Sequence, residues 1–382
     1  MQFNGPEGQA DMPYLLTPGP VTTSRGVKLA MLADWGSRDG EFSNLVKQIR
    51  GELLRLAGAD LSYECVLMQG SGTFAIEAAL GSLAPRKRKK TLVVANGAYG
   101  ERAGKILETL GRPFERISKS DTTQLQPTHF TRMLDEDPTL THVWLVHCET
   151  SSGIVNPLSD LAREVKLRGR LLMVDAMSSF GALDINMARD GIDVLVSSSN
   201  KCIEGVPGFS YVLLKKDLLM AAEGNSHSVV LDLFEQWKAL ELSGQFRFTP
   251  PTHALAAFHR ALQELEQEGG TAMRLIRYQR NADILIAGLT KLGLVPLLPE
   301  DNAGPIIQTF LTPQDSNFRF EDFYERLHKR GLAIYPGKLT RRESFRIGTI
   351  GHLNEDVMMR VVNAVGEVLI QMNVKDMTPR DL

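Results

Sequence analysis

Short apolar runs recur along this chain, and each ends in small polar residues that lead into a segment with a helical pattern. The runs have the length of buried strands. They occupy residues 64–68, 91–95, 142–147, 171–174 and 194–196, and residues 209–214 are expected to add a sixth strand. A repeated order of strand, loop and helix indicates an α/β fold with a mostly parallel central sheet and helices on both faces.

The length of 382 residues exceeds the size at which one hydrophobic core keeps growing, so two domains are expected. After a helical stretch at 254–292 the alternation starts again, with strands expected at 305–311, 332–335 and 345–347 and helices at 321–330 and 356–372. We therefore predict an N-terminal arm (1–15), a large ligand-binding domain (16–262) and a smaller C-terminal α/β domain (263–382).

Composition argues against several classes of protein. A net charge of -2 gives no electrostatic reason to expect a nucleic acid or an anionic membrane as partner. No apolar run approaches the ~20 residues that span a bilayer, and residues 1–14 lack the pattern of a secretory signal. Cys65, Cys148 and Cys202 have no Cys-x-x-Cys spacing, which argues against disulfides and a zinc site. We therefore expect a cytoplasmic protein.

The segment 193–209 places one lysine directly after a buried strand. Three serines and Asn200 follow the apolar run, and then Lys201 precedes a Gly/Pro-rich turn. Open α/β sheets bind ligands at the carboxyl ends of their strands. An amine partly desolvated there has a lowered pKa and can form a Schiff base with a carbonyl. The alternative is an ordinary solvated loop lysine, because most lysines are exposed.

Another strand end has the pattern of an anion site. Gly70-Ser71-Gly72-Thr73 opens a helix, so its backbone N–H groups and hydroxyls can hold a phosphate at the positive end of the helix dipole. Gly70-x-Gly72-x-x-Ala75 also fits the dinucleotide fingerprint. That fingerprint needs an acidic residue after the next strand, where residues 95–97 provide none, so a monophosphate is favoured.

Tyr99 and Asp175 lie at two further strand ends. The Tyr99 ring can stack on a flat ligand, although a half-buried packing role fits it equally well. Asp175 ends an apolar strand, so its carboxylate should be paired with a cationic group. The alternatives are an N-cap or a structural ion pair. His142 and His147 lack the spacing of a metal pair, and we interpret His147 and Glu149 as packed, hydrogen-bonded neighbours.

These four kinds of group match one cofactor. Pyridoxal 5'-phosphate requires a phosphate cradle, a stacking ring, a buried carboxylate and a desolvated lysine. Its aldehyde forms a Schiff base with the lysine, and its ring nitrogen is kept protonated by the acid. Each motif is weak alone. Together they are specific, because an unrelated α/β protein has no reason to supply all of them at successive strand ends.

The same residues carry a family resemblance over residues 14–353. The chain resembles the class V, fold-type I aminotransferases, which have counterparts of Thr17-Pro18-Gly19-Pro20, Ser71-Gly72-Thr73, Gly97-Ala98-Tyr99-Gly100, Val174-Asp175 and Ser199-Asn200-Lys201. Within that class, segments 200–209, 247–253 and 344–348 are most similar to the transaminases that use 2-aminoethylphosphonate and pyruvate. The resemblance implies a large PLP-binding domain, a homodimer with shared active sites, and these two small-molecule substrates.

The resemblance also implies a role for each site residue. Lys201 is implied to be the Schiff-base lysine and Asp175 the partner of the ring nitrogen. The remaining implied roles are phosphate binding by Ser71, Gly72 and Thr73, stacking by Tyr99, a cofactor contact by Asn200, a contact of Thr249 with the neighbouring subunit's cofactor phosphate, and substrate-anion binding by Arg346.

Two other functions stay open from the sequence. Serine- and alanine-glyoxylate transaminases share most of these motifs, and a non-catalytic PLP-binding regulator is a hypothesis of a different class. The Lys201 and Asp175 pair argues against the regulator, as does the absence of a recognisable nucleic-acid-binding segment. A cysteine desulfurase needs a cysteine on a later loop, and none follows Cys202.

Overall fold

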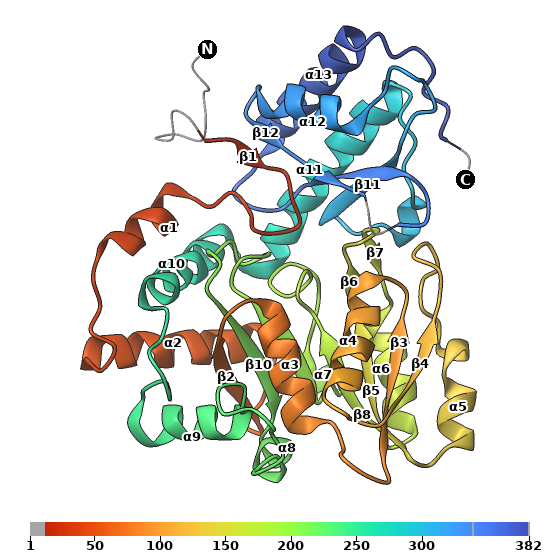
Figure 1. The fold of residues 1–382 in the computed structure, drawn as a ribbon. Helices are drawn as coiled ribbons and strands as arrows, with labels where there is room; N and C mark the ends of the chain where they lie inside the picture. The colour runs from red at the N-terminus through yellow and green to blue at the C-terminus, as the bar shows by residue number, and fades with distance from the viewer. Residues whose placement is uncertain (1–11, 338–339, 381–382) are drawn as a thin grey trace.

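The computed structural model describes residues 12–337 and 340–380, and Figure 1 shows them as two stacked units. Residues 1–11 of the predicted N-terminal arm lie outside the described part. The larger unit is built on a central sheet, in which the described residues form seven strands in the spatial order β2-β10-β9-β8-β5-β3-β4. Their bounds are β2 Tyr63–Gln69, β3 Lys90–Ala95, β4 Phe114–Ser118, β5 Leu140–Val146, β8 Leu171–Asp175, β9 Val194–Ser198 and β10 Phe209–Lys215.

The sheet is mostly parallel, as the sequence predicts, and β10 is the reversed strand. It pairs antiparallel with both β2 and β9, so β2 and β9 run in the same direction. Only residues 199–208 separate β9 from β10. A parallel connection needs a dozen or more residues to cross the sheet, so this short segment can only turn the chain back. Lys201 lies in this return loop, at the carboxyl edge of the sheet.

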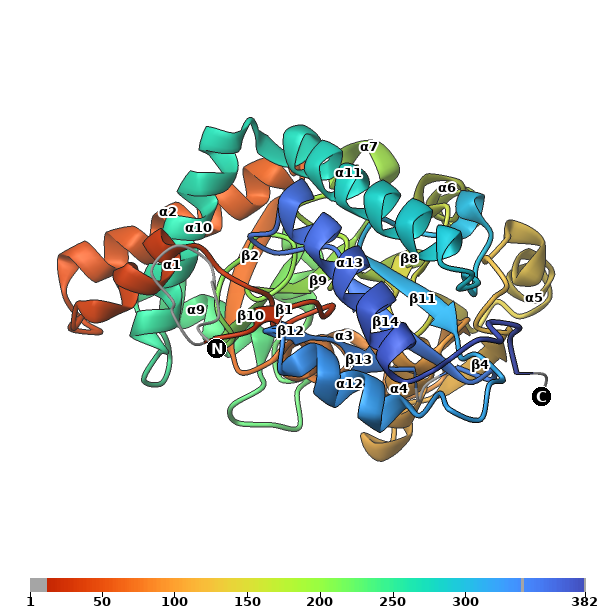
Figure 2. The ribbon, with the colours of Figure 1, turned by 90° about the horizontal axis from the view of Figure 1, so that it is seen from above.

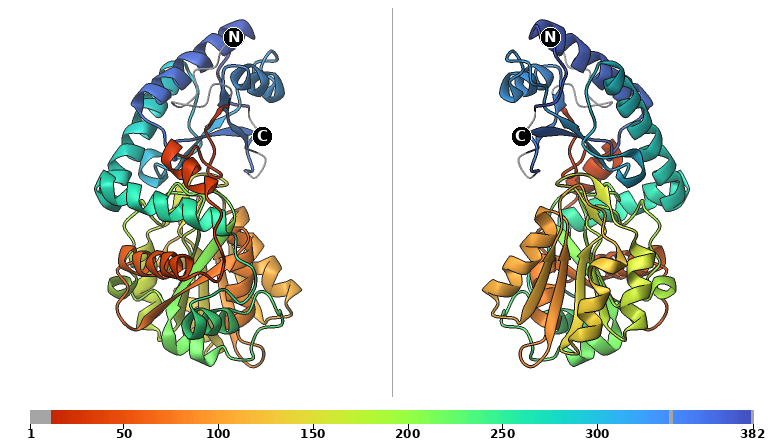
Figure 3. Two further views of the ribbon diagram at one scale, coloured as in Figure 1. Left: turned by 90° about the vertical axis from the view of Figure 1, so that its left-hand side faces the viewer. Right: turned by 90° about the vertical axis from the view of Figure 1, so that its right-hand side faces the viewer.

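Helices cover both faces of the sheet, which confirms the predicted fold class. On one face α2 (Gly40–Leu56), α6 (Leu158–Leu167) and α10 (Thr252–Glu268) share a core with the strands. On the other face lie α3 (Gly72–Leu83), α4 (Ala98–Thr109) and α9 (Leu233–Ser243). Figure 3 shows the sheet between these two layers. Helix α2 illustrates the pattern, since its buried residues recur at helical spacing: Phe42, Leu45, Val46, Ile49 and Leu53.

Strand β4 is the one strand of the central sheet that the sequence analysis missed. It is an edge strand that pairs in parallel with β3. Its residues are only partly buried or exposed, and its centre carries Glu115 and Arg116. An edge strand with one solvated face has no continuous apolar run, so the signal that predicts the inner strands is absent here.

The smaller unit is formed by the C-terminal part of the chain. Strands β11 (Ile307–Leu311), β14 (Ser344–Gly348) and β13 (Tyr335–Pro336) form an antiparallel sheet, covered by α11 (Gly270–Lys291), α12 (Phe320–His328) and α13 (Glu355–Gln371). Figure 2 shows α11 and α13 side by side over this sheet. The N-terminal segment also joins this unit, because β1 (Tyr14–Leu15) pairs with β12 (Leu332–Ala333) and Leu16 is buried in the same core. The boundaries at 15/16 and 262/263 stay predictions.

The shorter helices lie around the two units: α1 Arg25–Leu29, α5 Thr131–Glu136, α7 Met187–Asp190 and α8 Lys216–Ala221. A small ribbon, β6 (Cys148–Glu149) with β7 (Ile154–Val155), extends from the end of β5 toward the C-terminal unit. Among the described residues, no helix has both the length and the apolar character that crossing a bilayer requires.

Candidate active site

A cavity of about 230 Å³ lies at the carboxyl edge of the central sheet. The sequence predicts a ligand site at this edge, because parallel strands end side by side there. Most of the predicted site residues line the cavity, namely Ser71, Gly72, Thr73, Tyr99, Asp175, Asn200 and Lys201. The fold therefore brings together groups that are separated by up to about a third of the chain.

Lys201 reaches the cavity from the return loop between β9 and β10. Its Nζ donates a hydrogen bond to the backbone oxygen of Pro18 at 2.7 Å. Burial lowers the pKa of the amine to about 8. Gly19 leaves room for the lysine, because a Cβ there would lie 2.5 Å from Lys201 Cδ, and its φ of +120° also favours glycine. The turn that contains Pro18 and Gly19 thus closes over the lysine.

Asp175 ends β8, the strand that pairs in parallel with β9. The side chain is 2% exposed, and Oδ1 accepts a hydrogen bond from the backbone N–H of Met177 at 2.9 Å. Burial raises the pKa of the carboxyl group to about 7, against the lowering effect of the Met177 N–H. A cationic ligand group beside Asp175 would favour its ionised form.

The predicted phosphate cradle lies at the first turn of α3. Ser71 is the N-cap residue, and its side chain makes no capping hydrogen bond, so the hydroxyl is free to face a ligand. Gly72 packs against Met177, and a Cβ at this position would lie 2.2 Å from the Met177 sulfur. Backbone N–H groups at a helix start, together with hydroxyls, form a good anion site.

Arg102 is a cavity residue that the sequence analysis missed. Its Nη1 lies 3.3 Å from the Thr73 hydroxyl oxygen, and its guanidinium carbon lies 4.8 Å from the centroid of the Tyr99 ring. Tyr99 and Arg102 are three residues apart on α4, so they share one face of the helix. That spacing is the signal by which the sequence could have indicated a cation beside the phosphate cradle.

Glu149 holds the start of α4 and thereby the backbone of Tyr99. Oε2 accepts hydrogen bonds from the N–H groups of Tyr99 at 3.0 Å and Gly100 at 3.2 Å, and Oε1 accepts from the Ser151 hydroxyl at 2.6 Å. The predicted hydrogen-bonded pair of His147 and Glu149 is wrong, since the buried His147 Nδ1 has no partner among the described residues. The positive end of the α4 dipole offers the carboxylate stronger partners.

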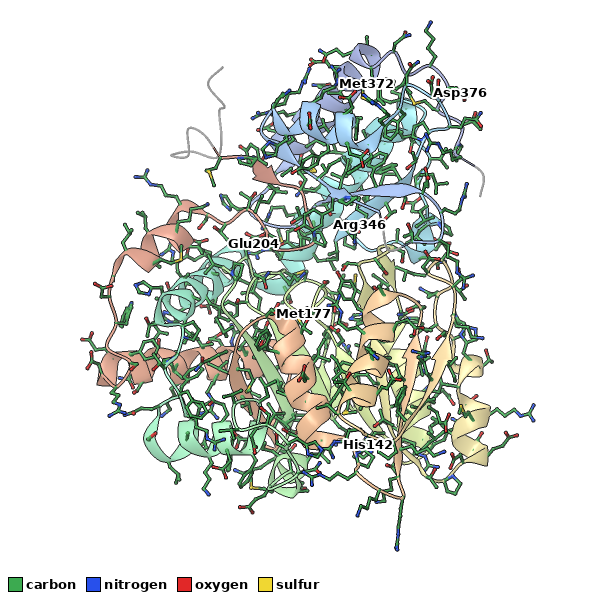
Figure 4. The ribbon with its side chains drawn as sticks, in the orientation of Figure 1. His142, Met177, Glu204, Arg346, Met372 and Asp376 are labelled. Carbon is green, nitrogen blue, oxygen red and sulfur yellow. The ribbon has the colours of Figure 1, made fainter. Side chains whose placement is uncertain are left out.

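Arg346 adjoins the cavity from the C-terminal unit. It is buried on β14, where Nη1 donates to the Thr150 oxygen at 2.8 Å and Nη2 to the Pro336 oxygen at 2.9 Å. Thr150 lines the cavity, and Figure 4 shows Arg346 above Met177 at the junction of the units. Both acceptors are neutral backbone oxygens, so they do not neutralise the guanidinium, and its positive charge can attract an anionic ligand.

Thr249 does not line the cavity. It lies exposed between α9 and α10. The neighbouring Phe248 oxygen accepts a hydrogen bond from Gln69 at 3.1 Å, which ties this segment to the end of β2. The role implied for Thr249 belongs to a partner subunit's site and stays a prediction.

Comparison with known proteins identifies the family. The sequence profile described as aminotransferase class-V matches residues 33–356.

The chain belongs to the class V aminotransferases.

Among its relatives, the 2-aminoethylphosphonate–pyruvate transaminase of Rhizobium meliloti (strain 1021) is 50% identical over 368 residues, which cover 96% of both chains. That of Pseudomonas putida (strain GB-1) is 48% identical and covers 96% of this chain and 100% of its own.

Two solved structures share the fold of this class V aminotransferase. A pyridoxamine-pyruvate aminotransferase from Mesorhizobium loti has a TM-score of 0.87 at 22% identity, with 98% and 96% of the two chains covered. An alanine–glyoxylate aminotransferase from Nostoc has a TM-score of 0.86 at 23% identity, with 96% and 97% covered.

The cofactor of this class V aminotransferase is pyridoxal 5'-phosphate, and the cavity fits it. The Ser71 hydroxyl and the start of α3 suit the phosphate, the Tyr99 ring offers a flat face, and Asp175 is a buried carboxyl group next to a cavity. Lys201 supplies an amine whose neutral form is accessible near pH 8, because burial lowers its pKa to about 8. Among the described residues, no cluster of His, Cys, Asp and Glu could hold a metal ion.

Proposed function

We propose that this chain transfers the amino group of 2-aminoethylphosphonate to pyruvate, giving phosphonoacetaldehyde and alanine. The choice of substrate rests on sequence identity. Two relatives named 2-aminoethylphosphonate–pyruvate transaminase are 50% and 48% identical to this chain over 96% of its length. The serine- or alanine-glyoxylate alternative is not favoured, because the likeness to the Nostoc enzyme is one of fold alone. A non-catalytic regulator is not favoured either. The proposed reaction would serve the breakdown of phosphonates.

Three parts of the cavity would hold the cofactor: the phosphate cradle, Arg102 and the Tyr99 ring. Ser71, Gly72 and Thr73 would bind its phosphate with hydroxyls and backbone N–H groups. Arg102 would add a positive charge beside that phosphate, since the cradle itself offers only neutral donors. Tyr99 would stack on the ring, and its backbone is fixed by the hydrogen bond to Glu149.

The reaction needs one proton-transfer group and one buried negative charge. When bound, pyridoxal 5'-phosphate supplies the carbonyl that receives the amino group and a ring that delocalises the negative charge of the reacting carbon. In each half-reaction Lys201 would take a proton from the carbon that gives up the amino group and deliver a proton to the carbon that receives it, so it ends each half-reaction as it began. Its lowered pKa makes the neutral amine accessible for the first of these transfers. Asp175 would hold a proton on the ring nitrogen by keeping a negative charge next to it.

Arg346 would bind the anionic end of both substrates. The phosphonate of the donor and the carboxylate of pyruvate both present two oxygens to a planar guanidinium, which can bind either in a bidentate manner. To do so, Arg346 would exchange at least one of its bonds to the Thr150 and Pro336 oxygens for the substrate. One cation can therefore serve two half-reactions whose substrates occupy the site in turn.

We also infer a homodimer in which Thr249 reaches the phosphate in the partner subunit's site. The exposed position of Thr249 outside its own cavity is compatible with this role. A two-fold assembly would then form two shared sites.

The test combines a spectrum with a comparison of donors. The purified protein should show the absorbance of bound cofactor, lose it on addition of 2-aminoethylphosphonate and regain it on addition of pyruvate. Borohydride reduction and peptide mapping should label Lys201. Faster turnover of serine or alanine with glyoxylate would overturn the substrate and leave the class standing, whereas a label on another lysine would overturn the site.

A further inference from the structure

Glu204 occupies an unusual place in the return loop. It follows Lys201 by three residues, its side chain is buried, and its φ of +64° lies in the left-handed region that few residues other than glycine adopt. Its backbone N–H donates to the Lys201 oxygen at 2.9 Å, so the two residues close one turn. Figure 4 shows Glu204 at the junction of the two units. Such a backbone persists only where the surroundings enforce it.

The surroundings that enforce it come from helix α11. Glu204 Oε1 accepts hydrogen bonds from the Tyr278 hydroxyl at 2.6 Å and from Arg277 Nη2 at 2.7 Å, and Arg274 Nη1 lies 3.4 Å away. The same two arginines bind Glu268 through their Nε atoms, at 2.7 Å from Arg274 and 2.9 Å from Arg277. Two carboxylates and two guanidinium groups thus balance one another, which a buried charge requires.

The same face of α11 also holds the backbone on both sides of the active site. Arg274 Nη1 donates to the Cys202 oxygen, next to Lys201, at 2.6 Å. Arg277 Nη1 donates to the Gly351 oxygen at 2.7 Å, in the segment that follows the strand of Arg346. One helix surface therefore connects the loop of the candidate catalytic lysine to the segment that follows the candidate anion-binding arginine.

We propose that Glu204 is a positioning residue, which fixes the turn of Lys201 against α11 and so sets the Lys201 amine relative to Arg346. This inference rests on the proposed roles of these two residues. Within the part of the chain that the structure describes, the Lys201 amine is held by one hydrogen bond, to the Pro18 oxygen, so the loop backbone must define where the amine lies. Reacting groups need this accuracy, since small displacements cost large factors in rate.

The experiment compares Glu204→Gln with a matched variant at the opposite end of the same strand. Asp193 precedes β9, is as deeply buried as Glu204, and also contacts two cations, Lys166 at 2.7 Å and Lys215 at 3.1 Å. Both Glu204→Gln and Asp193→Asn should lower the thermal midpoint of unfolding, because each removes the charge of a buried carboxylate that pairs with two cations. Only Glu204→Gln should lower kcat per folded site, by roughly 10- to 100-fold, with KM for pyruvate little changed.

A second measurement needs no turnover. In the cofactor-free protein, the pH dependence with which an amine reagent labels Lys201 should have a midpoint near the pKa of about 8 that burial produces. In Glu204→Gln the loosened loop should admit water, so this midpoint should rise, while Asp175, Cys148, Cys202 and Arg346 around the amine are unchanged. Asp193→Asn should keep the wild-type midpoint. Because no substrate is used, this measurement tests Glu204 even if the proposed substrates are wrong.

Tyr278→Phe provides a gentler variant if Glu204→Gln does not fold. It removes one hydroxyl, which lies 2.6 Å from Glu204 Oε1, and should move kcat and the labelling midpoint in the same direction by smaller amounts. A lower thermal midpoint with wild-type kcat and wild-type labelling in these variants would overturn the proposal and leave Glu204 as a purely structural residue.

Discussion

The two edges of the central sheet both bury charged side chains, but they treat them differently. At the amino edge, Asp193 is 1% exposed and accepts hydrogen bonds from Lys166 Nζ and from the Leu172 backbone N–H, both at 2.7 Å. At the carboxyl edge, the hydrogen bonds that hold the Lys201 and Asp175 side chains are to single backbone groups. The pKa of Lys201 falls to about 8 and that of Asp175 rises to about 7.

This difference separates a structural charge from a functional one. A buried charge must be paired, and the amino edge supplies the pair from within the chain. The carboxyl edge keeps its acid and its amine apart beside a cavity, so a ligand can supply what each lacks. Perturbed pKa values in a cavity are typical of sites that perform chemistry.

The largest effect on kcat is expected at Asp175, the buried acid of the carboxyl edge. Asp175→Asn should keep the fold and lower kcat by roughly 10²- to 10³-fold, because an amide cannot stabilise a protonated ring nitrogen. The Asp193→Asn variant should show the opposite pattern, with lower stability and nearly unchanged kcat. Steady-state kinetics and thermal unfolding of both variants check this. Near wild-type kcat in Asp175→Asn would mean that Asp175 is structural, like Asp193.

A smaller effect, on KM, is expected when an arginine at the carboxyl edge is compared with a buried arginine at the amino edge. Arg346→Lys keeps the charge but loses the planar fork, so KM for 2-aminoethylphosphonate and for pyruvate should both rise, by about tenfold or more. Arg112 is the matched control at the amino edge, where it is buried and donates to the Ala84 oxygen at 2.9 Å and the Asn225 oxygen at 2.6 Å. Arg112→Lys should lower stability and leave both KM values as they are. A rise in only one KM of Arg346→Lys would assign Arg346 to a single half-reaction.

The smallest effect concerns the cofactor phosphate. Arg102→Gln should weaken binding of pyridoxal 5'-phosphate by about tenfold, the equivalent of one modest charge contact, and leave binding of pyridoxal, which lacks the phosphate, unchanged. Lys105→Gln on the same helix is the control, because Lys105 is exposed and pairs with Glu108. Titration of the cofactor-free protein measures all four affinities. Equal losses for the two ligands would mean that Arg102 acts through the Tyr99 ring rather than on the phosphate.

The sequence predicted most of the elements and the composition of the cavity wall. The inner strands were recognised because they are continuous apolar runs, and the site residues because they follow those runs. Strand β4 is not predicted, because an edge strand with a solvated face has no continuous apolar run. Arg102 is missed because the strand-end pattern indicates only the residues directly after a strand, whereas Arg102 lies one helical turn beyond Tyr99 in α4.

What the sequence determined by itself is local: where strands end, which side chains follow them, and which helix starts there. These features depend on periodicity and turn chemistry within a few residues, so they can be recognised in one dimension. The tertiary structure decided the contacts between distant segments: Pro18 bonded to Lys201, Thr150 bonded to Arg346, and α11 bonded to Glu204. No local pattern encodes such contacts, because each depends on how two separately folded elements pack and on which polar groups burial leaves to be satisfied.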